Sequence, residues 1–168
     1  ARSWALAAIA SEQAKAGDGE GAKVTASQIE SASDRYSALA AIASEQAKAG
    51  DVEGAKVTAS QIESVRDRSR ALAAIALEQA KAGDGEGAKE TFAQAQKAAS
   101  QLESASDRSW ALAAIASAQA KAGDVEGAKE TFAQAQKAAS QIESVRDRSR
   151  ALAAIASAQA KAGDGEGA

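Results

Sequence analysis

Residues 34–62 read DRYSALAAIASEQAKAGDVEGAKVTASQI, and this stretch decides the fold. Its first half is rich in alanine, the best helix former, and the stretch contains no proline. Asp34 is suited to cap the start of a helix. Gly50 is suited to end it, because glycine tolerates the left-handed backbone found at helix ends. The pattern therefore predicts a helix over about 35–49.

A second helix is predicted directly after this glycine. Asp51 can cap it, and Glu53 lies in its first turn, where negative charge is favourable beside the positive end of the helix dipole. Its apolar side follows the i, i+3, i+4, i+7 spacing of one helical face, at Ala55, Thr58, Ala59 and Ile62. Two amphipathic helices joined by a Gly-Asp turn form an αα-hairpin.

The hairpin recurs along the whole chain. The tripeptide Ala-Gly-Asp places its glycine at 17, 50, 83, 123 and 163, with intervals of 33, 33, 40 and 40 residues. The acids Asp34, Asp67, Asp107 and Asp147 repeat in the same register. We therefore predict one solenoid domain, 1–168, with repeats 1–33, 34–66, 67–106 and 107–146 and an unpaired or capping C-terminal helix, 147–168.

The longer repeats carry seven added residues within the second helix. Seven residues are nearly two turns, so the helix lengthens by about 10 Å while its apolar face rotates by only about 20°. The units 87–122 and 127–162 differ at only four positions. Natural repeats that have drifted are rarely so alike, and this similarity favours a designed or consensus array.

Composition excludes several classes of function. The chain has no Cys and no His, so disulfides, thiolate catalysis and the usual zinc sites are excluded. Its 20 basic and 23 acidic residues are interspersed and give a net charge of −3, which disfavours nucleic acid as a partner. No apolar run is long enough for a membrane span, and no targeting signal is present, consistent with soluble cytoplasmic expression. We expect neither an enzyme nor a cofactor, because the available acids and lysines recur in every repeat instead of forming one unique constellation.

The repeat resembles the tetratricopeptide repeat. Gly123-Asp124 matches its turn, Ile115 its apolar position and Phe132 the aromatic of its second helix, and its small-residue positions match Ala116, Ala128 and Ala135. Leu112 stands where that family has Trp, and no Pro closes the unit. The resemblance implies an all-α, right-handed α-solenoid of stacked αα-hairpins with about nine helices. Other helical-hairpin repeats, such as the HEAT type, share the same small and aliphatic pattern.

The resemblance also implies a concave surface, lined by the first helix of each repeat, that binds peptides or proteins. Carried over by position, the candidate residues are Trp4, Ser37, Arg70, Trp110 and Arg150 near the helix starts and Lys15, Lys48, Lys81, Lys121 and Lys161 near the helix ends. Each Lys equally complements the helix dipole. The aromatics, Tyr36 included, equally suit packing between hairpins. The arginines around Asp67 suit Arg–Asp pairing between repeats.

Two functional hypotheses follow. The leading one is a designed or consensus scaffold without an evolved ligand, and the alternative is a peptide- or protein-binding module. The C-terminal helix keeps Leu152 and Ile155 with no polar replacement, so we also expect an exposed apolar face at this end and self-association through the terminal helices.

Overall fold

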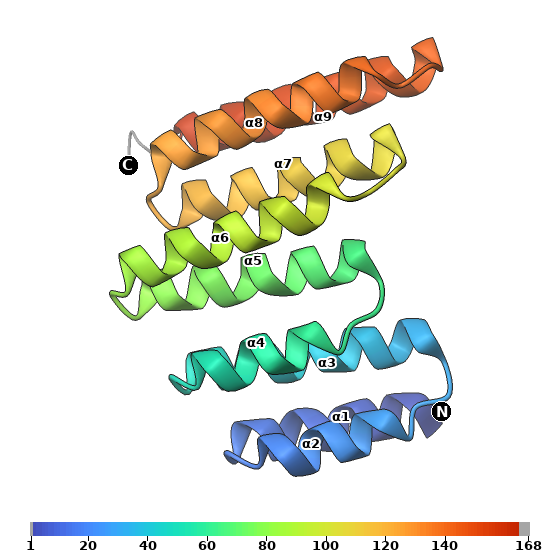
Figure 1. Ribbon diagram of the computed structural model, residues 1–168, viewed down its shortest axis with the longest axis vertical. Helices are drawn as coiled ribbons and strands as arrows, with labels where there is room; N and C mark the ends of the chain where they lie inside the picture. The colour runs from blue at the N-terminus through green and yellow to red at the C-terminus, as the bar shows by residue number, and fades with distance from the viewer. Residues whose placement is uncertain (1, 165–168) are drawn as a thin grey trace.

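The computed structural model describes residues 2–164, and all regular structure within this range is helical. Five first helices are α1 (Arg2–Lys15), α3 (Ala32–Lys48), α5 (Val65–Lys81), α7 (Ala105–Lys121) and α9 (Val145–Asp164). Four second helices are α2 (Gly19–Ser27), α4 (Val52–Ser60), α6 (Gly85–Ser100) and α8 (Val125–Ser140). The predicted all-α class, with nine helices in the described range, is confirmed (Figure 1).

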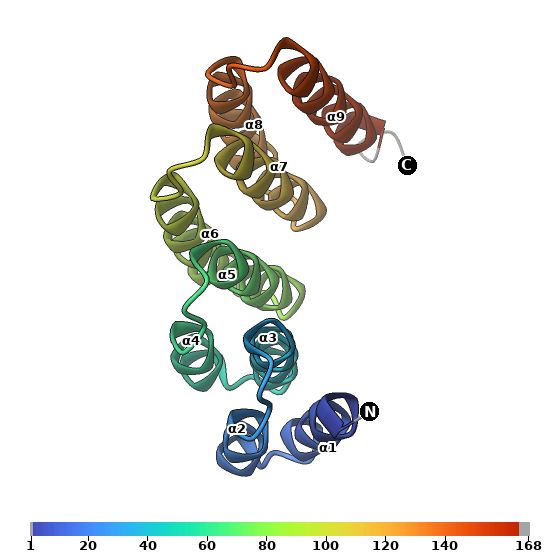
Figure 2. The same ribbon diagram turned by 90° about the vertical axis from the view of Figure 1, so that its right-hand side faces the viewer.

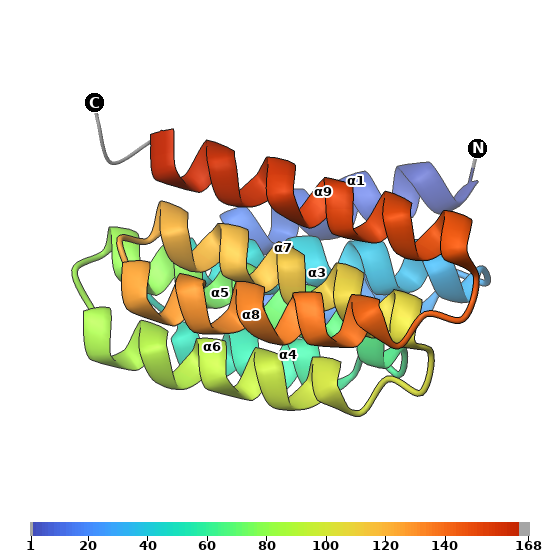
Figure 3. The same cartoon turned by 90° about the horizontal axis from the view of Figure 1, so that it is seen from above.

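The helices form two rows. Each first helix contacts the next first helix, and each second helix contacts the first helices before and after it. No comparable contact joins one second helix to the next in the described range. Figure 2 shows the consequence, a curved molecule with the first helices on its inner side. Seen from above, α1 and α9 lie on one side and α4 and α6 on the other (Figure 3).

Each hairpin turn forms as the sequence predicts. Gly50 has φ 88°, and the Asp51 N–H donates to the Gln46 carbonyl at 2.9 Å, which satisfies a carbonyl at the end of α3. The Asp51 carboxylate accepts from the Gly54 N–H at 2.9 Å and caps α4. Gly17, Gly83 and Gly123 repeat this conformation. Gly163 does not, because α9 continues through it as a helix.

The start of the first helices corrects one prediction. Asp34 is not the cap: the Ser31 hydroxyl accepts from the Asp34 N–H at 3.3 Å, and α3 begins at Ala32. Asp34 lies within the first turn, where its charge still favours the helix dipole. Serine caps recur at Ser64, Ser104 and Ser144. The Ser31 hydroxyl, and not the Asp34 carboxylate, caps the helix, because it accepts from the third N–H of the helix.

Small residues dominate the core. Most buried apolar side chains are alanines, and the largest fully buried ones include Phe92 and Ile115. The second helices have 9 residues in the shorter repeats and 16 in the longer ones, as the seven-residue insertion predicts. Because alanine leaves little bulk between helices, the two rows pack closely.

The two ends of the rows expose apolar side chains that are buried elsewhere. Ile9 is 52% exposed, whereas its equivalent Ile115 is fully buried. At the other end, Leu152 is 37% exposed and its equivalent Leu112 is 3% exposed. The prediction for Leu152 is confirmed, but that for Ile155 is wrong, because Ile155 is 1% exposed. The isoleucine of each first helix faces the preceding repeat, and only the leucine faces the next.

Candidate protein-binding face

One side of every first helix is exposed. In α7 the exposed stripe contains Trp110, Ala114 and Lys121, spaced as neighbours on one helical face, and the buried residues occupy the opposite side. We call the equivalent stripes of α1, α3, α5, α7 and α9 the inner face. All ten residues carried over from the resemblance are exposed: Trp4, Ser37, Arg70, Trp110, Arg150, Lys15, Lys48, Lys81, Lys121 and Lys161.

Aromatic and basic side chains lie at the start of these helices. Trp4 is 78% exposed and Trp110 is 44% exposed, while Arg70 and Arg150 are also exposed. Arg66, by contrast, bridges two repeats, since its Nη1 lies 3.8 Å from Asp107 Oδ1. This confirms Arg–Asp pairing between repeats for Arg66 and leaves Arg70 available on the surface.

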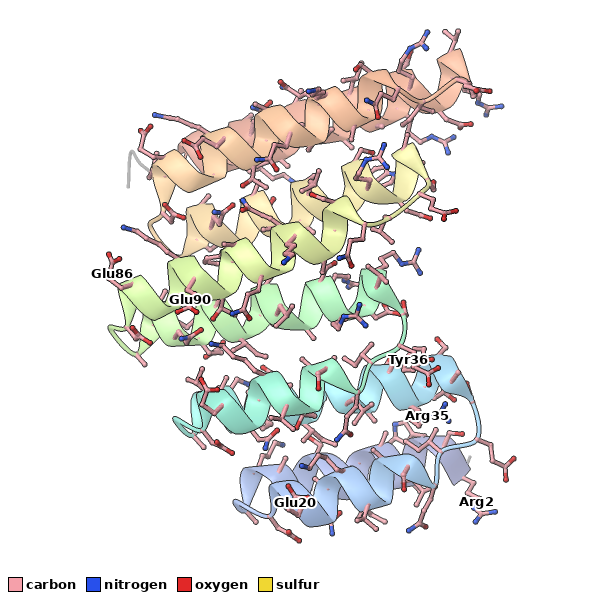
Figure 4. The ribbon with its side chains drawn as sticks, in the orientation of Figure 1. Arg2, Glu20, Arg35, Tyr36, Glu86 and Glu90 are labelled. Carbon is pink, nitrogen blue, oxygen red and sulfur yellow. The ribbon has the colours of Figure 1, made fainter. Side chains whose placement is uncertain are left out.

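Tyr36 links α3 to the segment that connects α4 with α5. Its hydroxyl donates to Glu63 Oε2 at 3.0 Å, from α3 to the segment before α5, and Arg35 lies over its ring (Figure 4). The hydrogen bond to Glu63 raises the pKa of Tyr36 above its ordinary value, and burial adds to the shift. The contact lies within the repeat 34–66, so it gives this aromatic a structural role inside its own repeat.

The lysines at the helix ends fall into two groups. Lys15, Lys48 and Lys81 bind the glutamate three residues earlier at 2.7, 2.8 and 2.8 Å. The hydrogen bonds to these glutamates raise the pKa of Lys15 and Lys48. In α7 and α9 alanine replaces that glutamate, at positions 118 and 158. Lys121 and Lys161 consequently form no ion pair with any described side chain.

These two lysines border the same groove. A groove of about 920 Å³ lies between the end of α7, the start of α8 and the second half of α9. Its floor includes Phe132 and several alanines, and its charged lining residues are Lys121, Lys129 and Lys161. One repeat earlier, the equivalent groove measures only about 170 Å³ and is bordered by the turn 122–124. The structure thus joins two of the ten candidates in one concavity and spreads the others along the rows.

A buried polar network supports three of the hairpins, and sequence reasoning missed it. Thr58 was assigned to an apolar face, but its hydroxyl donates to Gln46 Oε1 at 2.6 Å. Gln46 Nε2 in turn donates to the capping Asp51 at 3.3 Å. The same arrangement recurs around Gln79 and Gln119. The signal available in the sequence is a Gln followed by Thr twelve residues later in every hairpin.

No group of three or more acidic side chains within residues 2–164 is arranged to hold a metal ion. In the same range, no helix combines the length and apolar character needed to cross a membrane.

Comparison with known proteins gives a likeness of fold. No family model and no curated protein matches the chain. A crystal structure, Ton1535 from Thermococcus onnurineus NA1, matches with a TM-score of 0.70 at 22% sequence identity. The match covers 95% of this chain and 48% of that one, so this chain spans about half the length of its structural neighbour. At this identity the likeness concerns the fold alone.

Proposed function

We propose that the chain is a protein-interaction module whose inner face binds an acidic segment of another protein. The observation that carries this proposal is the loss of the glutamate partner at Lys121 and Lys161. Over α1, α3 and α5 the lysines are neutralised by adjacent acids, whereas none of the described acidic side chains pairs with Lys121 of α7 or Lys161 of α9. The α7–α9 part of the inner face is therefore its cationic part.

Apolar and aromatic surface accompanies this charge. Trp110 and Arg150 lie at the starts of the same two helices, and the groove beside their ends has an apolar floor. Aromatic and arginine side chains contribute strongly to protein interfaces. A partner with acidic residues beside apolar ones complements both features. Two exposed lysines mainly accelerate and orient association, so binding should weaken with salt.

The arrangement of the rows is part of the proposal. We infer that the hairpins stack as a right-handed, tetratricopeptide-like solenoid, which would keep the exposed stripes of successive first helices in register. The Gly-Asp turns, the small-residue positions and the succession of contacts between first helices support this architecture.

Fluorescence of Trp110 provides the test. The Trp4→Phe variant leaves Trp110 as the single tryptophan. A short synthetic peptide of Glu, Leu and Phe should change its emission saturably, and this change should diminish as salt is raised. A peptide with Lys in place of Glu should have no effect.

A matched pair of variants separates local contact from net charge. The double variant Lys121→Ala/Lys161→Ala should weaken peptide binding about tenfold. Lys48→Ala/Lys81→Ala removes the same total charge from lysines that are already paired, and it should weaken binding much less. Equal losses in the two variants would contradict a site at α7 and α9.

A scaffold without an evolved ligand is the second candidate. The near-identity of the units 87–122 and 127–162 favours it, since a selected binding surface usually varies between repeats. Absence of saturable binding by every acidic peptide tested would favour this alternative.

A further inference from the structure

Two sets of arginines lie near the starts of the first helices. One set donates from Nη1 to a backbone carbonyl in the segment before its own helix, and it consists of Arg35, Arg68, Arg108 and Arg148. Arg70 and Arg150 follow two residues later and form no ion pair with any described residue. Arg70 is in this state even though α7 packs beside α5. The guanidinium groups of Arg70 and Arg150 are therefore available to a ligand.

The starts of α5, α7 and α9 lie side by side. Arg66 Nη1 of α5 lies 3.8 Å from Asp107 Oδ1 of α7. Arg108 Nη2 of α7 donates to Gln141 Oε1, between α8 and α9, at 2.7 Å. The three helices also pack one against the next along the inner side of the curve (Figure 2). Equivalent positions near their starts therefore form a row across the inner face.

This row has a defined composition. At one equivalent position α5 carries Arg70, α7 carries Trp110 and α9 carries Arg150, and all three side chains are exposed. We call these three residues the Arg–Trp–Arg row. At the same position α3 carries Ser37, whose hydroxyl donates to the Ser33 carbonyl of its own helix at 3.0 Å. The row of large side chains consequently begins at α5.

The chemistry of the row defines three complementary groups. A guanidinium group is planar and donates two parallel hydrogen bonds to a carboxylate. The indole of Trp110, 44% exposed, offers an apolar surface between the two arginines. The row therefore fits an acidic, an apolar and a second acidic side chain, in this order.

The spacing of the helices sets the spacing of these groups. Packed helices lie about 8–10 Å apart, and alanines among the buried residues of α5 and α7 favour the short end of this range. A polyproline-II segment presents every third residue on one side, about 9 Å apart. A β-strand would turn the third residue to its opposite side. A helical ligand would need seven residues and about 10.5 Å for each step.

We propose that the Arg–Trp–Arg row binds a polyproline-II segment of the partner with the spacing Glu-x-x-Leu-x-x-Glu. This inference rests on the function proposed above and adds the spacing and the backbone conformation of the recognised segment. Lys121 and Lys161 lie eleven residues further along their helices, about 16 Å away. They attract an acidic partner from a distance, whereas the row selects its spacing.

Two peptides of identical composition test the spacing. The matched peptide is Glu-Ala-Pro-Leu-Ala-Pro-Glu, and its isomer Glu-Ala-Pro-Leu-Glu-Ala-Pro has the second acid displaced. Trp110 emission in the Trp4→Phe variant should show binding of the matched peptide that is about tenfold tighter, because the isomer loses one carboxylate–guanidinium contact. Equal, salt-dependent binding of both would overturn the spacing and leave the proposed function standing. No binding of either would contradict both.

Replacing the prolines of the matched peptide by alanine tests the conformation. Proline favours the polyproline-II backbone and opposes the α-helix, so the alanine peptide should bind more weakly. Tighter binding of the alanine peptide would indicate a helical ligand and would overturn the proposal.

A matched pair of variants on α5 tests the row itself. Arg70→Ala should reduce binding of the matched peptide to that of the isomer. Arg66→Ala removes the same charge one turn earlier, from a guanidinium group that already pairs with Asp107, and should preserve the preference. Circular dichroism verifies that both variants remain folded. A preference that survives Arg70→Ala, or that both variants abolish equally, would overturn the proposal.

Charge reversal provides the final test. Arg70→Glu should bind one of the two peptides Lys-Ala-Pro-Leu-Ala-Pro-Glu and Glu-Ala-Pro-Leu-Ala-Pro-Lys more tightly than it binds the original. The peptide that restores binding also gives the direction of the segment across the helices. Failure of both peptides to restore binding would overturn the contact between Arg70 and an acidic side chain.

Discussion

At the scale of single residues, the hydroxyl groups of this chain make contacts that composition does not reveal. The Tyr36 hydroxyl joins α3 to the segment after α4, and in every hairpin a threonine hydroxyl donates to a glutamine of the preceding helix. Each is one group with a defined partner, so its contribution can be measured by removing a single atom.

Tyr36 should titrate above its ordinary pKa of 10.0, because Glu63 accepts a hydrogen bond only from its neutral form. A pKa that is raised on folding stabilises the fold fully below the unfolded value, and this stabilisation is lost as pH rises through the folded value. Since Tyr36 is the single tyrosine, absorbance of tyrosinate reports it directly. Glu63→Gln should move the midpoint back toward 10.0, and a midpoint below 10.0 in the unmodified chain would contradict the contact.

Thr91→Val should destabilise the chain by about 1–3 kcal/mol, because it leaves the buried Gln79 Oε1 without its donor at 2.6 Å. Ser100→Ala removes an exposed hydroxyl from the same helix and should cost less than about 0.5 kcal/mol. Urea unfolding of both variants measures the difference. A similar midpoint for the two would show that the network contributes little.

At the scale of helices, the glycines of the second helix starts have different roles. A Cβ at position 87 would lie 2.0 Å from Asp84 Oδ2 and 2.6 Å from Gln79 Nε2, whereas a Cβ at position 85 would meet nothing within 4 Å. The equivalents of Gly85 in other repeats include Val52 and Val125. The Asp84 cap therefore requires glycine at position 87 but not at position 85.

Replacement by alanine should therefore raise the stability of the fold at position 85 and lower it at position 87. Gly85→Ala should stabilise the chain by about 0.4–1 kcal/mol, because alanine restricts the unfolded chain at a position without steric conflict. Gly87→Ala should destabilise it by about 1–2 kcal/mol through loss of the Asp84 cap. Thermal unfolding followed by circular dichroism distinguishes the two variants. A loss of stability in both would contradict the conclusion that alanine fits at position 85 without steric conflict.

At the scale of the whole molecule, stability depends on the place of a repeat in the row. Ile115→Ala should cost about 2–5 kcal/mol, because the side chain is fully buried against the preceding repeat. Ile9→Ala should cost less than about 1 kcal/mol, since Ile9 is 52% exposed and no repeat precedes it in the structure. Denaturant titrations compare the pair. Equal losses in the free energy of unfolding would mean that the isoleucine stabilises the fold through contacts within its own hairpin, and not through stacking on the preceding repeat.

Local interactions are what the sequence by itself determined. Helices, glycine turns, aspartate caps of the second helices and the seven-residue extension depend on groups within a few residues of one another, and all were predicted. The start of the first helices was not, because Ser31 and Asp34 both have the chemistry of a cap and only the backbone geometry chooses between them. The ten inner-face residues were carried over from the resemblance to the tetratricopeptide repeat, and all of them are exposed.

Only the tertiary structure decided which repeats differ in exposed surface, because that depends on neighbours distant in sequence. Position 9 and position 115 carry the same isoleucine, yet the presence or absence of a preceding repeat buries one and exposes the other. Ala118 and Ala158 already distinguish Lys121 and Lys161 from the other lysines in the sequence, but only packing places the two lysines beside one groove. Likewise, residues 111–121 of α7 and 151–161 of α9 are identical, but α8 packs much more extensively against α7 than against α9. Residue identity sets what a surface can bind, and packing between repeats sets which copy of that surface remains open.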